Sequence, residues 1–388
     1  MRSVRDIKEL RNIPVIVRAA LNVPVENGVV VNDYRLRRAL PTIQFLLEGG
    51  ARVVLISHMG EAGTETLEPV ANALDSYLGN VSFCATTIGV EARAAVRALP
   101  AGSVLVMENL RRNAGEVGND RAFAQELAAL GDIFVQDSFD TCHRKHASIV
   151  TLPTLLPSYA GLVVEEEVMA LSGALTPKHP GLAVVGGAKF STKEAVLTTL
   201  LKTYDHVFVG GALASDFLKA GGHEVGASLT SATDSAGVRE LLGNPKLVLP
   251  VDALVVPKDS VDALDARERA HVVSIDQIGK DDFILDHGPG TLALISELAQ
   301  KSRSIMWNGP LGLYEKGFVD TTDGFARAVA ASDAHSVVGG GDTVASIQNL
   351  GLMTRFSFVS TGGGAMLEFL ARGSLPGIDA IEHGYGSD

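Results

Sequence analysis

The chain has 388 residues, 46% of them hydrophobic, and a formal net charge of −12 at pH 7. This length and apolar content suit two ordinary domains better than one, and the negative charge argues against general nucleic-acid binding. No apolar run approaches the roughly 20 residues that cross a bilayer, and the charged first residues lack a secretion signal. Only two cysteines occur, which argues against a disulfide scaffold or a cysteine-bound zinc ion. We expect a cytoplasmic monomer without nucleic-acid or membrane partners.

The first half of the chain alternates strand-like and helix-like segments. Continuous apolar runs predict buried parallel strands at residues 14–18, 52–57, 103–107 and 132–135. Two sets of leucines and other apolar residues recur at helical spacing between strands, and Gly49 is a typical C-cap residue after the first set. Strands that alternate with helices imply βαβ units and a parallel sheet.

Polar and basic side chains follow these four strands. They are Arg18 and Asn22, then His58, then Arg111, and finally His143, Arg144 and His146. Because ligands bind beyond the carboxyl ends of parallel strands, we expect these side chains to converge on one basic edge. Arginine donors suit carboxylate and phosphate oxygens, so the pattern favours a small, highly anionic substrate. The alternatives are that the arginines lie in solvent or in ion pairs, and that the histidines are packed in the core.

A connecting helix and a breaker divide the chain. Residues 165–175 form the helix, with one apolar face, and TPKHP at residues 176–180 ends it. We therefore predict an N-terminal domain at residues 1–162, a hinge helix at 163–177 and a C-terminal domain at 178–374, with the tail 375–388 packing back on the first domain. The predicted fold class is α/β, with two doubly wound, Rossmann-like parallel-sheet domains.

Five apolar runs in the second half end in glycines and then become helical. They are GLAVVGGAK (residues 181–189), VFVGGA (207–212), IMWNGP (305–310), HSVVGGGDTVAS (335–346) and FVSTGGGA (358–365). Together they predict one glycine-lined sheet edge that holds a large, phosphate-bearing ligand. In the fourth run, Asp342 and Thr343 are N-cap residue types, so free N–H groups of the following helix should face an anion. A carboxylate beside a phosphate also invites Mg²⁺. A plain strand-to-helix turn is the alternative for any one run.

Neither a Walker A loop nor a dinucleotide fingerprint is present, and no G-x-S-x-G nucleophile motif occurs. One edge for an anionic substrate and one for nucleotide phosphates suggest phosphoryl transfer, which depends on positioning, charge neutralisation and water exclusion. Exclusion of water by two domains would require closure through the hinge helix.

The chain resembles the phosphoglycerate kinase family over residues 15–381. Residues 35–47 are similar to the family's helix after the first strand. The ordered motifs that carry the resemblance are SHMG (57–60), LEPVA (67–71), ENLR (108–111), HRKH (143–146), GGAK (186–189), LPVD (249–252), WNGP (307–310), GGGDT (339–343), STGGGA (360–365) and LPGIDA (375–380). Such an ordered set is very improbable by chance.

The resemblance implies reversible phosphoryl transfer from 1,3-bisphosphoglycerate to Mg-ADP, which gives 3-phosphoglycerate and ATP. It implies that phosphoglycerate is held on the N-terminal domain by Asn22, Arg35, His58, Arg111 and Arg144. It implies catalytic roles for Arg35, Lys189, Gly341 and Gly364, with Lys189 neutralising the charge of the transferring group. It assigns the nucleotide to Gly187, Lys193, Gly211, Asn308, Pro310, Glu315, Gly340, Gly341, Asp342 and Thr343, and Mg²⁺ to Asp342.

The departures from the family pattern fall in the acid-binding half. Residues 18–24 read RAALNVP where the family has RVDFNVP, so Ala20 replaces an aspartate that bonds the substrate hydroxyl. Glu61 stands where the family has an arginine, and Arg112 replaces an aromatic residue and could compensate if it points inward. Residues 136–140 read QDSFD in place of NDAFG.

Several interpretations remain open at this point. A phosphoglycerate kinase with a modified acid-binding edge is favoured, because Arg35, Arg111 and Arg144 are present. A kinase of the same fold that acts on another small carboxylate or acyl phosphate is the second interpretation. A non-catalytic nucleotide-binding protein is the third, and the presence of both Lys189 and Asp342 counts against it. A dehydrogenase is disfavoured by the missing fingerprint.

Overall fold

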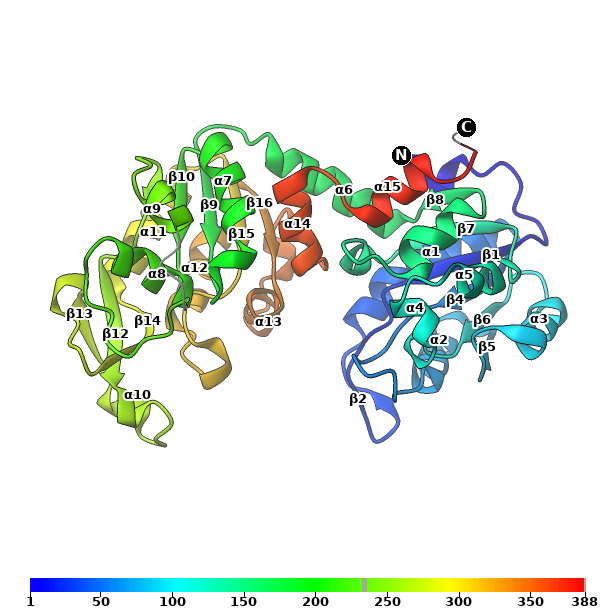
Figure 1. The fold of residues 1–388 in the computed structure, drawn as a ribbon, viewed down its shortest axis with the longest axis horizontal. Coiled ribbons are helices and arrows are strands. Elements are labelled where there is room, and N and C mark those ends of the chain that lie inside the picture. Colours follow the sequence, from blue (N-terminus) through cyan, green and yellow to red (C-terminus); the bar gives the residue numbers. More distant parts are fainter. Residues whose placement is uncertain (232–235, 387–388) are drawn as a thin grey trace. The chain divides into compact units, whose positions relative to one another are not determined.

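The computed structural model describes residues 1–231 and 236–386. Its contacts divide the chain into two compact units (Figure 1). Unit 1 contains Met1–Met169 and Ser374–Asp388, and unit 2 contains Ala170–Gly373. The border between them falls within helix α6 (Leu162–Leu175). Within the described ranges, no helix combines the length and the apolar character that a membrane crossing needs.

A six-stranded parallel sheet forms the centre of unit 1. Its order is β5-β6-β4-β1-β7-β8, and the strands are β1 (Pro14–Ala19), β4 (Arg52–Ile56), β5 (Val81–Cys84), β6 (Val104–Met107), β7 (Ile133–Asp137) and β8 (Ser158–Ala160). The four predicted strands are confirmed as β1, β4, β6 and β7, with ends that differ by two residues or fewer. A short hairpin, β2 (Val25–Glu26) and β3 (Val29–Val30), precedes the first helix.

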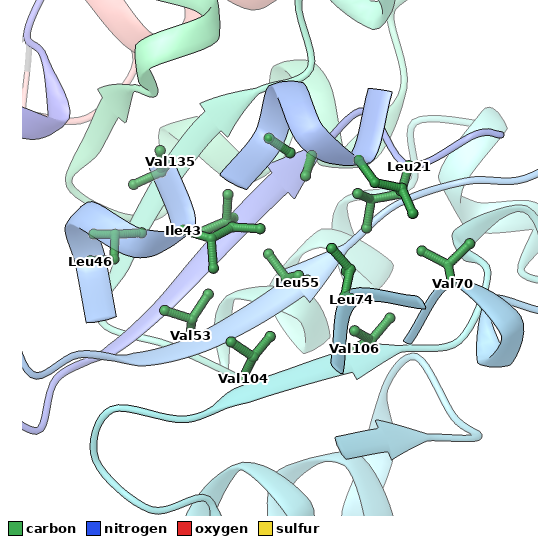
Figure 2. Packing of buried hydrophobic residues seen from close by; sticks show 14 of the residues in the cluster. Leu21, Ile43, Leu46, Val53, Leu55, Val70, Leu74, Val104, Val106 and Val135 are labelled. Carbon is green, nitrogen blue, oxygen red and sulfur yellow. The ribbon is translucent and has the colours of Figure 1, made fainter. Parts of the chain in front are cut away.

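The helices of unit 1 are α1 (Tyr34–Glu48), α2 (Glu68–Leu78), α3 (Gly89–Ala98), α4 (Ala114–Val117), α5 (Arg121–Ala128) and the C-terminal α15 (Pro376–His383). The predicted end of α1 is confirmed, because Gly49 is its C-cap. Figure 2 shows the core, where α1 and α2 pack on the sheet. Leu46 and Ile43 of α1 and Leu74 of α2 are fully buried there against strand residues. Strands buried in this way read as continuous apolar runs, which is why the sequence revealed them.

The C-terminal tail joins unit 1 through α15. The Gly377 N–H donates to the Cys142 carbonyl over 2.8 Å. A β-carbon at Gly377 would lie 2.9 Å from Ile149 and 3.1 Å from Cys142, so only glycine allows this close packing.

A second six-stranded parallel sheet forms the centre of unit 2. Its order is β11-β10-β9-β15-β16-β17, and the strands are β9 (Gly181–Val185), β10 (His206–Val209), β11 (Leu247–Val248), β15 (Ser304–Asn308), β16 (His335–Gly339) and β17 (Phe358–Val359). The helices are α7 (Glu194–Thr203), α8 (Ala212–Ala220), α9 (Ala236–Leu242), α11 (Pro289–Lys301), α12 (Asp320–Ala330), α13 (Gly341–Asn349) and α14 (Gly364–Arg372). Two parallel six-stranded sheets with helices between their strands confirm the predicted fold class.

Unit 2 also contains an antiparallel sheet that the sequence did not predict. Its order is β13-β12-β14, with β12 (Asp252–Pro257), β13 (His271–Ser274) and β14 (Asp282–His287), and the short helix α10 (Ala266–Arg269) connects β12 to β13.

Candidate active site

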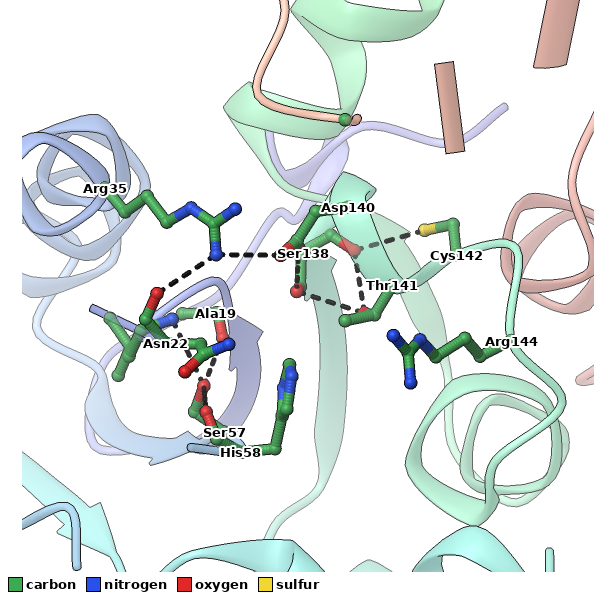
Figure 3. Close-up of polar contacts among 12 residues, drawn as sticks. Ala19, Asn22, Arg35, Ser57, His58, Ser138, Asp140, Thr141, Cys142 and Arg144 are labelled. Carbon is green, nitrogen blue, oxygen red and sulfur yellow. Dashed lines mark hydrogen bonds and ion pairs between the residues drawn. The ribbon is translucent and has the colours of Figure 1, made fainter. Parts of the chain in front are cut away.

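The basic side chains of unit 1 follow strands that are neighbours in the sheet, β6, β4, β1 and β7. Figure 3 shows Asn22, Arg35, His58 and Arg144 gathered beyond the ends of these strands. The Arg35 Nη1 donates to the Asn22 carbonyl over 3.0 Å and lies 3.5 Å from the Asp140 carboxylate. The Asn22 Oδ1 in turn accepts from the Gly60 N–H over 3.2 Å. The fold therefore brings these side chains together at one edge of the sheet, as the sequence predicted.

Arg18 supports this edge from below. Its side chain is fully buried and donates to the Ser57 Oγ over 3.3 Å, to the Ser148 Oγ over 3.2 Å and to the His58 Nδ1 over 3.0 Å. The Ser148 hydroxyl in turn donates to the buried Glu116 carboxylate over 2.6 Å. Arg18 thus positions other groups and does not present its guanidinium to a ligand.

His58 is held in one tautomer and kept neutral. Because a guanidinium can only donate, the His58 Nδ1 that faces Arg18 must accept, and the ring proton lies on Nε2. Burial, followed by the positive charges of Arg18, Arg111, Arg144 and Arg35, lowers the pKa of His58 to about 2. His58 therefore offers a neutral N–H donor within the field of four arginines.

Glu61 spans two of the predicted substrate arginines. Its Oε2 lies 3.0 Å from the Arg111 Nη1 and its Oε1 lies 3.6 Å from the Arg144 Nη2. Arg111 also donates to the Gly60 carbonyl. The hydrogen bond from Arg111 is the main reason that the pKa of Glu61 is lowered. The arginines are thus in ion pairs at this edge, as one of the alternatives held.

Arg112 does not compensate for Glu61. It pairs with Glu108 at 2.9 Å and donates to the Thr64 carbonyl over 3.3 Å. The Glu108 carboxylate is buried and also accepts from the Leu67 N–H, so it draws Arg112 away from Glu61. The idea that Arg112 points inward beside Glu61 is wrong.

His143 and His146 are half-buried. Burial, with Arg144 as the next cause, lowers the pKa of His146 to about 4. His146 is therefore neutral near pH 7, and its Nδ1 lies 3.9 Å from the Glu116 carboxylate. These contacts make His146 a packed residue that borders the edge.

The five glycine-rich strand ends of unit 2 belong to β10, β9, β15, β16 and β17, which are consecutive in the sheet. The loops after β9 and β15 touch through backbone: the Gly186 N–H donates to the Asn308 carbonyl over 2.8 Å, and the Gly187 N–H donates to the Pro310 carbonyl over 3.1 Å. A β-carbon at Gly186 would overlap the Pro310 carbonyl. Several of these glycines thus allow close contact between the loops.

A cavity of about 340 Å³ opens beside these loops. Its lining includes six predicted nucleotide residues, namely Gly187, Lys193, Gly211, Pro310, Glu315 and Asp342. Its other wall is largely apolar and comes from residues that sequence reasoning missed, namely Leu229, Phe283, Ile284, Leu285, Leu311 and Leu313. Phe283, Ile284 and Leu285 belong to β14 of the antiparallel sheet, and no short motif marks that strand.

Four predicted nucleotide residues are not among those that line the cavity, namely Asn308, Gly340, Gly341 and Thr343. Asn308 is buried, and its side-chain amide donates to the Met366 sulfur over 3.4 Å. A β-carbon at Gly340 would lie 3.6 Å from the Asn308 Oδ1. Asn308 therefore lies beside the glycine loop, and its expected contact with the nucleotide stays a prediction.

His287 and Asp286 are buried polar residues of the same cavity that the sequence did not indicate. The His287 Nε2 accepts from the Gly211 N–H over 3.0 Å. Burial lowers the pKa of His287 to about 4, so the ring is neutral and can accept near pH 7. Burial raises the pKa of Asp286 to about 6, although Thr321 and His287 N–H groups donate to it.

The helix start after the three glycines differs from the prediction. The N-cap of α13 is Gly340, with φ 101°, and Asp342 and Thr343 lie inside the first turn. The expectation that Asp342 and Thr343 are N-cap residues is therefore wrong, because only glycine takes this φ readily. Helix α14 begins in the same way, with Gly363 at the N-cap and Gly364 as its first residue. The first backbone N–H groups of both helices have no partner within their own helix.

Three charged side chains lie around these loops. Lys189 is exposed directly after the Gly186–Gly187 turn, and Lys193 is half-buried, which lowers its pKa. Asp342 is exposed in the first turn of α13. Its pKa is raised by desolvation and by the neighbouring carboxylate of Glu315.

Two parallel-sheet units, one with a basic edge and one with a glycine-lined cavity, define a two-domain α/β kinase. A family model described as phosphoglycerate kinase matches residues 4–372. The chain is 44% identical to a phosphoglycerate kinase of Rubrobacter xylanophilus, with 98% of both chains covered. It is 42% identical to that of Xanthobacter autotrophicus, with 97% of this chain and 98% of the relative covered. The chain belongs to the phosphoglycerate kinase family.

Solved structures agree with this assignment. The phosphoglycerate kinase of Coxiella burnetii superposes with a TM-score of 0.85 at 39% identity, and 98% of each chain is covered. That of Pyrococcus horikoshii has a TM-score of 0.85 at 30% identity, with the same coverage. Family membership makes the chain a kinase that uses phosphoglycerate, with ATP and ADP as co-substrates, and the alternative interpretations are not favoured.

Proposed function

We propose that the basic edge of unit 1 binds 3-phosphoglycerate or 1,3-bisphosphoglycerate, and that the cavity of unit 2 binds ADP or ATP, for reversible phosphoryl transfer between them. The observation that carries this assignment is the electrostatic surrounding of His58, which lies in the field of Arg35, Arg111 and Arg144 as well as Arg18. Such a concentration of positive charge in a chain of net charge −12 suits a small polyanion.

The residues of unit 1 would divide the substrate between them. Arg111 and Arg144 present guanidinium donors to phosphate or carboxylate oxygens. His58 donates its Nε2–H without adding charge, and Asn22 offers its amide beside it. Arg35 reaches the edge from α1, where Asn22 and Asp140 hold its side chain. All five residues expected to bind phosphoglycerate are supported by their place in this network.

The residues of unit 2 would hold the nucleotide by its different chemical parts. The apolar wall that includes Phe283 and Leu285 suits a base, and Glu315 suits ribose hydroxyls. The free N–H groups at the starts of α13 and α14, from Gly340, Gly341, Thr343 and Gly364, suit phosphate oxygens. Lys193 adds positive charge beside Gly187. Asn308 would add its side-chain amide from beside the glycine loop.

The donor set fits Mg²⁺ held by one carboxylate and by substrate phosphates. Asp342 is exposed beside the helix start. Desolvation, and after it the neighbouring carboxylate of Glu315, raise the pKa of Asp342, and a bound cation would offset both effects. The described ranges contain no group of three or more histidine, cysteine, aspartate or glutamate side chains that could hold a metal ion. Mg²⁺ commonly uses only one or two protein carboxylates and completes its shell with phosphates and water. The ion would supply neutralisation of phosphate charge.

Catalysis would rest on charge neutralisation. The transferring group spreads negative charge over its equatorial oxygens, and preorganised donors lower the barrier. We assign this role to Lys189 and Arg35, with the backbone N–H groups of Gly341 and Gly364. No covalent nucleophile is required, in agreement with the absence of a nucleophile motif.

We also propose a cytoplasmic monomer that binds neither nucleic acid nor membrane. Cys84 and Cys142 are buried free thiols, which suits a reducing compartment. Light scattering coupled to size-exclusion chromatography would measure the oligomeric state directly.

A coupled assay with 3-phosphoglycerate and Mg-ATP tests the proposed function. Lys189→Ala and Arg35→Ala should each lower kcat by about 10²-fold or more, the size of a lost transition-state contact. Arg37→Ala is the matched control, because Arg37 lies on the same helix and pairs with Asp33 on the exposed side. Full turnover in both Lys189→Ala and Arg35→Ala would refute these roles. Nucleotide binding without turnover in the unmodified chain would instead call for a panel of other carboxylates.

A further inference from the structure

Glu61 occupies donors that the proposed function gives to the substrate. Its two carboxylate oxygens pair with two different arginines, Arg111 at 3.0 Å and Arg144 at 3.6 Å. The carboxylate therefore spans the arginine pair as a bound anion would. The Arg111 side chain is only 3% exposed, so an incoming oxyanion has little other access to its guanidinium.

The Arg111 Nη1 is already shared between Glu61 and the Gly60 carbonyl. Each guanidinium N–H can make one strong hydrogen bond. A substrate oxygen that binds this nitrogen must therefore replace the Glu61 carboxylate, because the Gly60 carbonyl is fixed in the backbone.

The Glu61 side chain can move away from the two arginines at little cost. Its side chain is 79% exposed, so water solvates the carboxylate fully once it moves away. The loop that carries it remains anchored at both sides of Glu61. Gly60 accepts the hydrogen bond from Arg111, and Gly63 packs on the Arg111 backbone so closely that a β-carbon would overlap the Arg111 carbonyl. Both glycines have positive φ, 64° and 72°, which fixes the turn while the glutamate side chain stays free to rotate.

We propose that Glu61 is an internal competitor for the acid substrate, which occupies the Arg111–Arg144 pair until the substrate's anionic group displaces it. This inference rests on the proposed function of the basic edge. Every anion that binds this pair must displace the same carboxylate, so Glu61 would weaken the binding of all such anions by one common factor. Glu61 thus sets the affinity of the basic edge, and it raises the substrate concentration at which the enzyme works.

The test compares Glu61→Gln and Glu61→Ala with Glu26→Gln. Glu26 is an exposed carboxylate on β2, and its substitution makes the same change in net charge. Calorimetry measures the Kd of inorganic phosphate, and the coupled assay measures KM for 3-phosphoglycerate and for ATP. In both Glu61 variants we expect the Kd of phosphate and the KM for phosphoglycerate to fall by about two- to tenfold, because two ion pairs made by an exposed carboxylate are lost. The KM for ATP should stay constant.

Acetate provides a second readout. Its inhibition constant should fall in the Glu61 variants by the same factor as the Kd of phosphate, because each anion must displace the same carboxylate. Unchanged or weaker phosphate binding in both Glu61 variants would overturn the proposal, as would an equal gain in Glu26→Gln. Because phosphate binding requires no turnover, a failure of the proposed function would show as inactivity of the unmodified enzyme while the calorimetric comparison still decides the role of Glu61.

Discussion

Asp137 provides the sharpest test of the structure through the pH dependence of stability. Its side chain is buried at the end of β7, and its Oδ1 accepts from the Val163 N–H over 2.9 Å at the start of α6. Burial is the largest cause that raises its pKa, from 3.8 to about 7, and hydrogen bonds from Thr42 and Val163 oppose the rise. The folded chain therefore binds a proton at pH values where the unfolded chain has lost it.

Because of this difference, the stability that Asp137 contributes decreases as the pH rises. The contribution of Asp137 to stability is complete below about pH 4 and is lost as pH rises through about 7, since the fold must then bury a charge. The interval between 3.8 and about 7, at about 1.4 kcal/mol for each pH unit, limits the effect to about 4 kcal/mol. Asp137→Asn keeps an acceptor for Val163 and cannot ionise. It should match the unmodified chain near pH 4 and become more stable by up to about 4 kcal/mol at pH 8.

Urea unfolding at pH 5, 6, 7 and 8 measures the effect. Far-UV circular dichroism follows both units, whereas the single tryptophan, Trp307, is buried in unit 2 and reports on that unit. The gain in Asp137→Asn should appear in the dichroism transition of unit 1. Asp132→Asn, an exposed change five residues earlier, serves as the control. Stability curves of Asp137→Asn and the unmodified chain that run parallel from pH 5 to 8 would refute the reasoning.

Three further changes address the two proposed substrate sites. Gly186→Ala would force its β-carbon against the Pro310 carbonyl. We therefore expect the KM for ATP to rise at least tenfold and the unfolding transition seen by Trp307 fluorescence to move to a lower urea concentration. The KM for phosphoglycerate serves as the internal control. His287→Leu leaves the Gly211 N–H without its acceptor, and we expect a KM for ATP raised about fivefold at constant kcat, whereas an unchanged KM would exclude a role in positioning. Ala20→Asp should lower the KM for phosphoglycerate by about fivefold, as one added hydrogen bond would, and an unchanged or higher KM would show that the position does not face the substrate.

The glycine-lined edge could be predicted from patterns in the sequence alone. Each run that ends in glycine could be a simple turn, but parallel strands bring their carboxyl ends to one edge. Five such runs therefore predicted a shared edge, and β10, β9, β15, β16 and β17 are indeed consecutive in one sheet. The prediction needed only the parallel arrangement and no knowledge of strand order.

The cap of α13 and the position of Arg112 show where this reasoning fails. Both errors come from ranking residue types without their neighbours. Aspartate and threonine are good caps in general, but a backbone φ of 101° selects Gly340. An arginine beside an anion site is attractive in general, but Glu108 is buried and takes the Arg112 guanidinium.

The sequence by itself determined the α/β class, the parallel strands, the family and the chemical types at the two edges. These depend on local periodicity and on residues that lie close together in the chain. Only the tertiary structure decided that β14 supplies an apolar wall of the cavity, that Arg18 fixes the tautomer of His58, and that Glu61 lies across Arg111 and Arg144. These contacts join side chains that are distant in sequence, and their strength depends on burial and on competing partners, which no linear pattern contains.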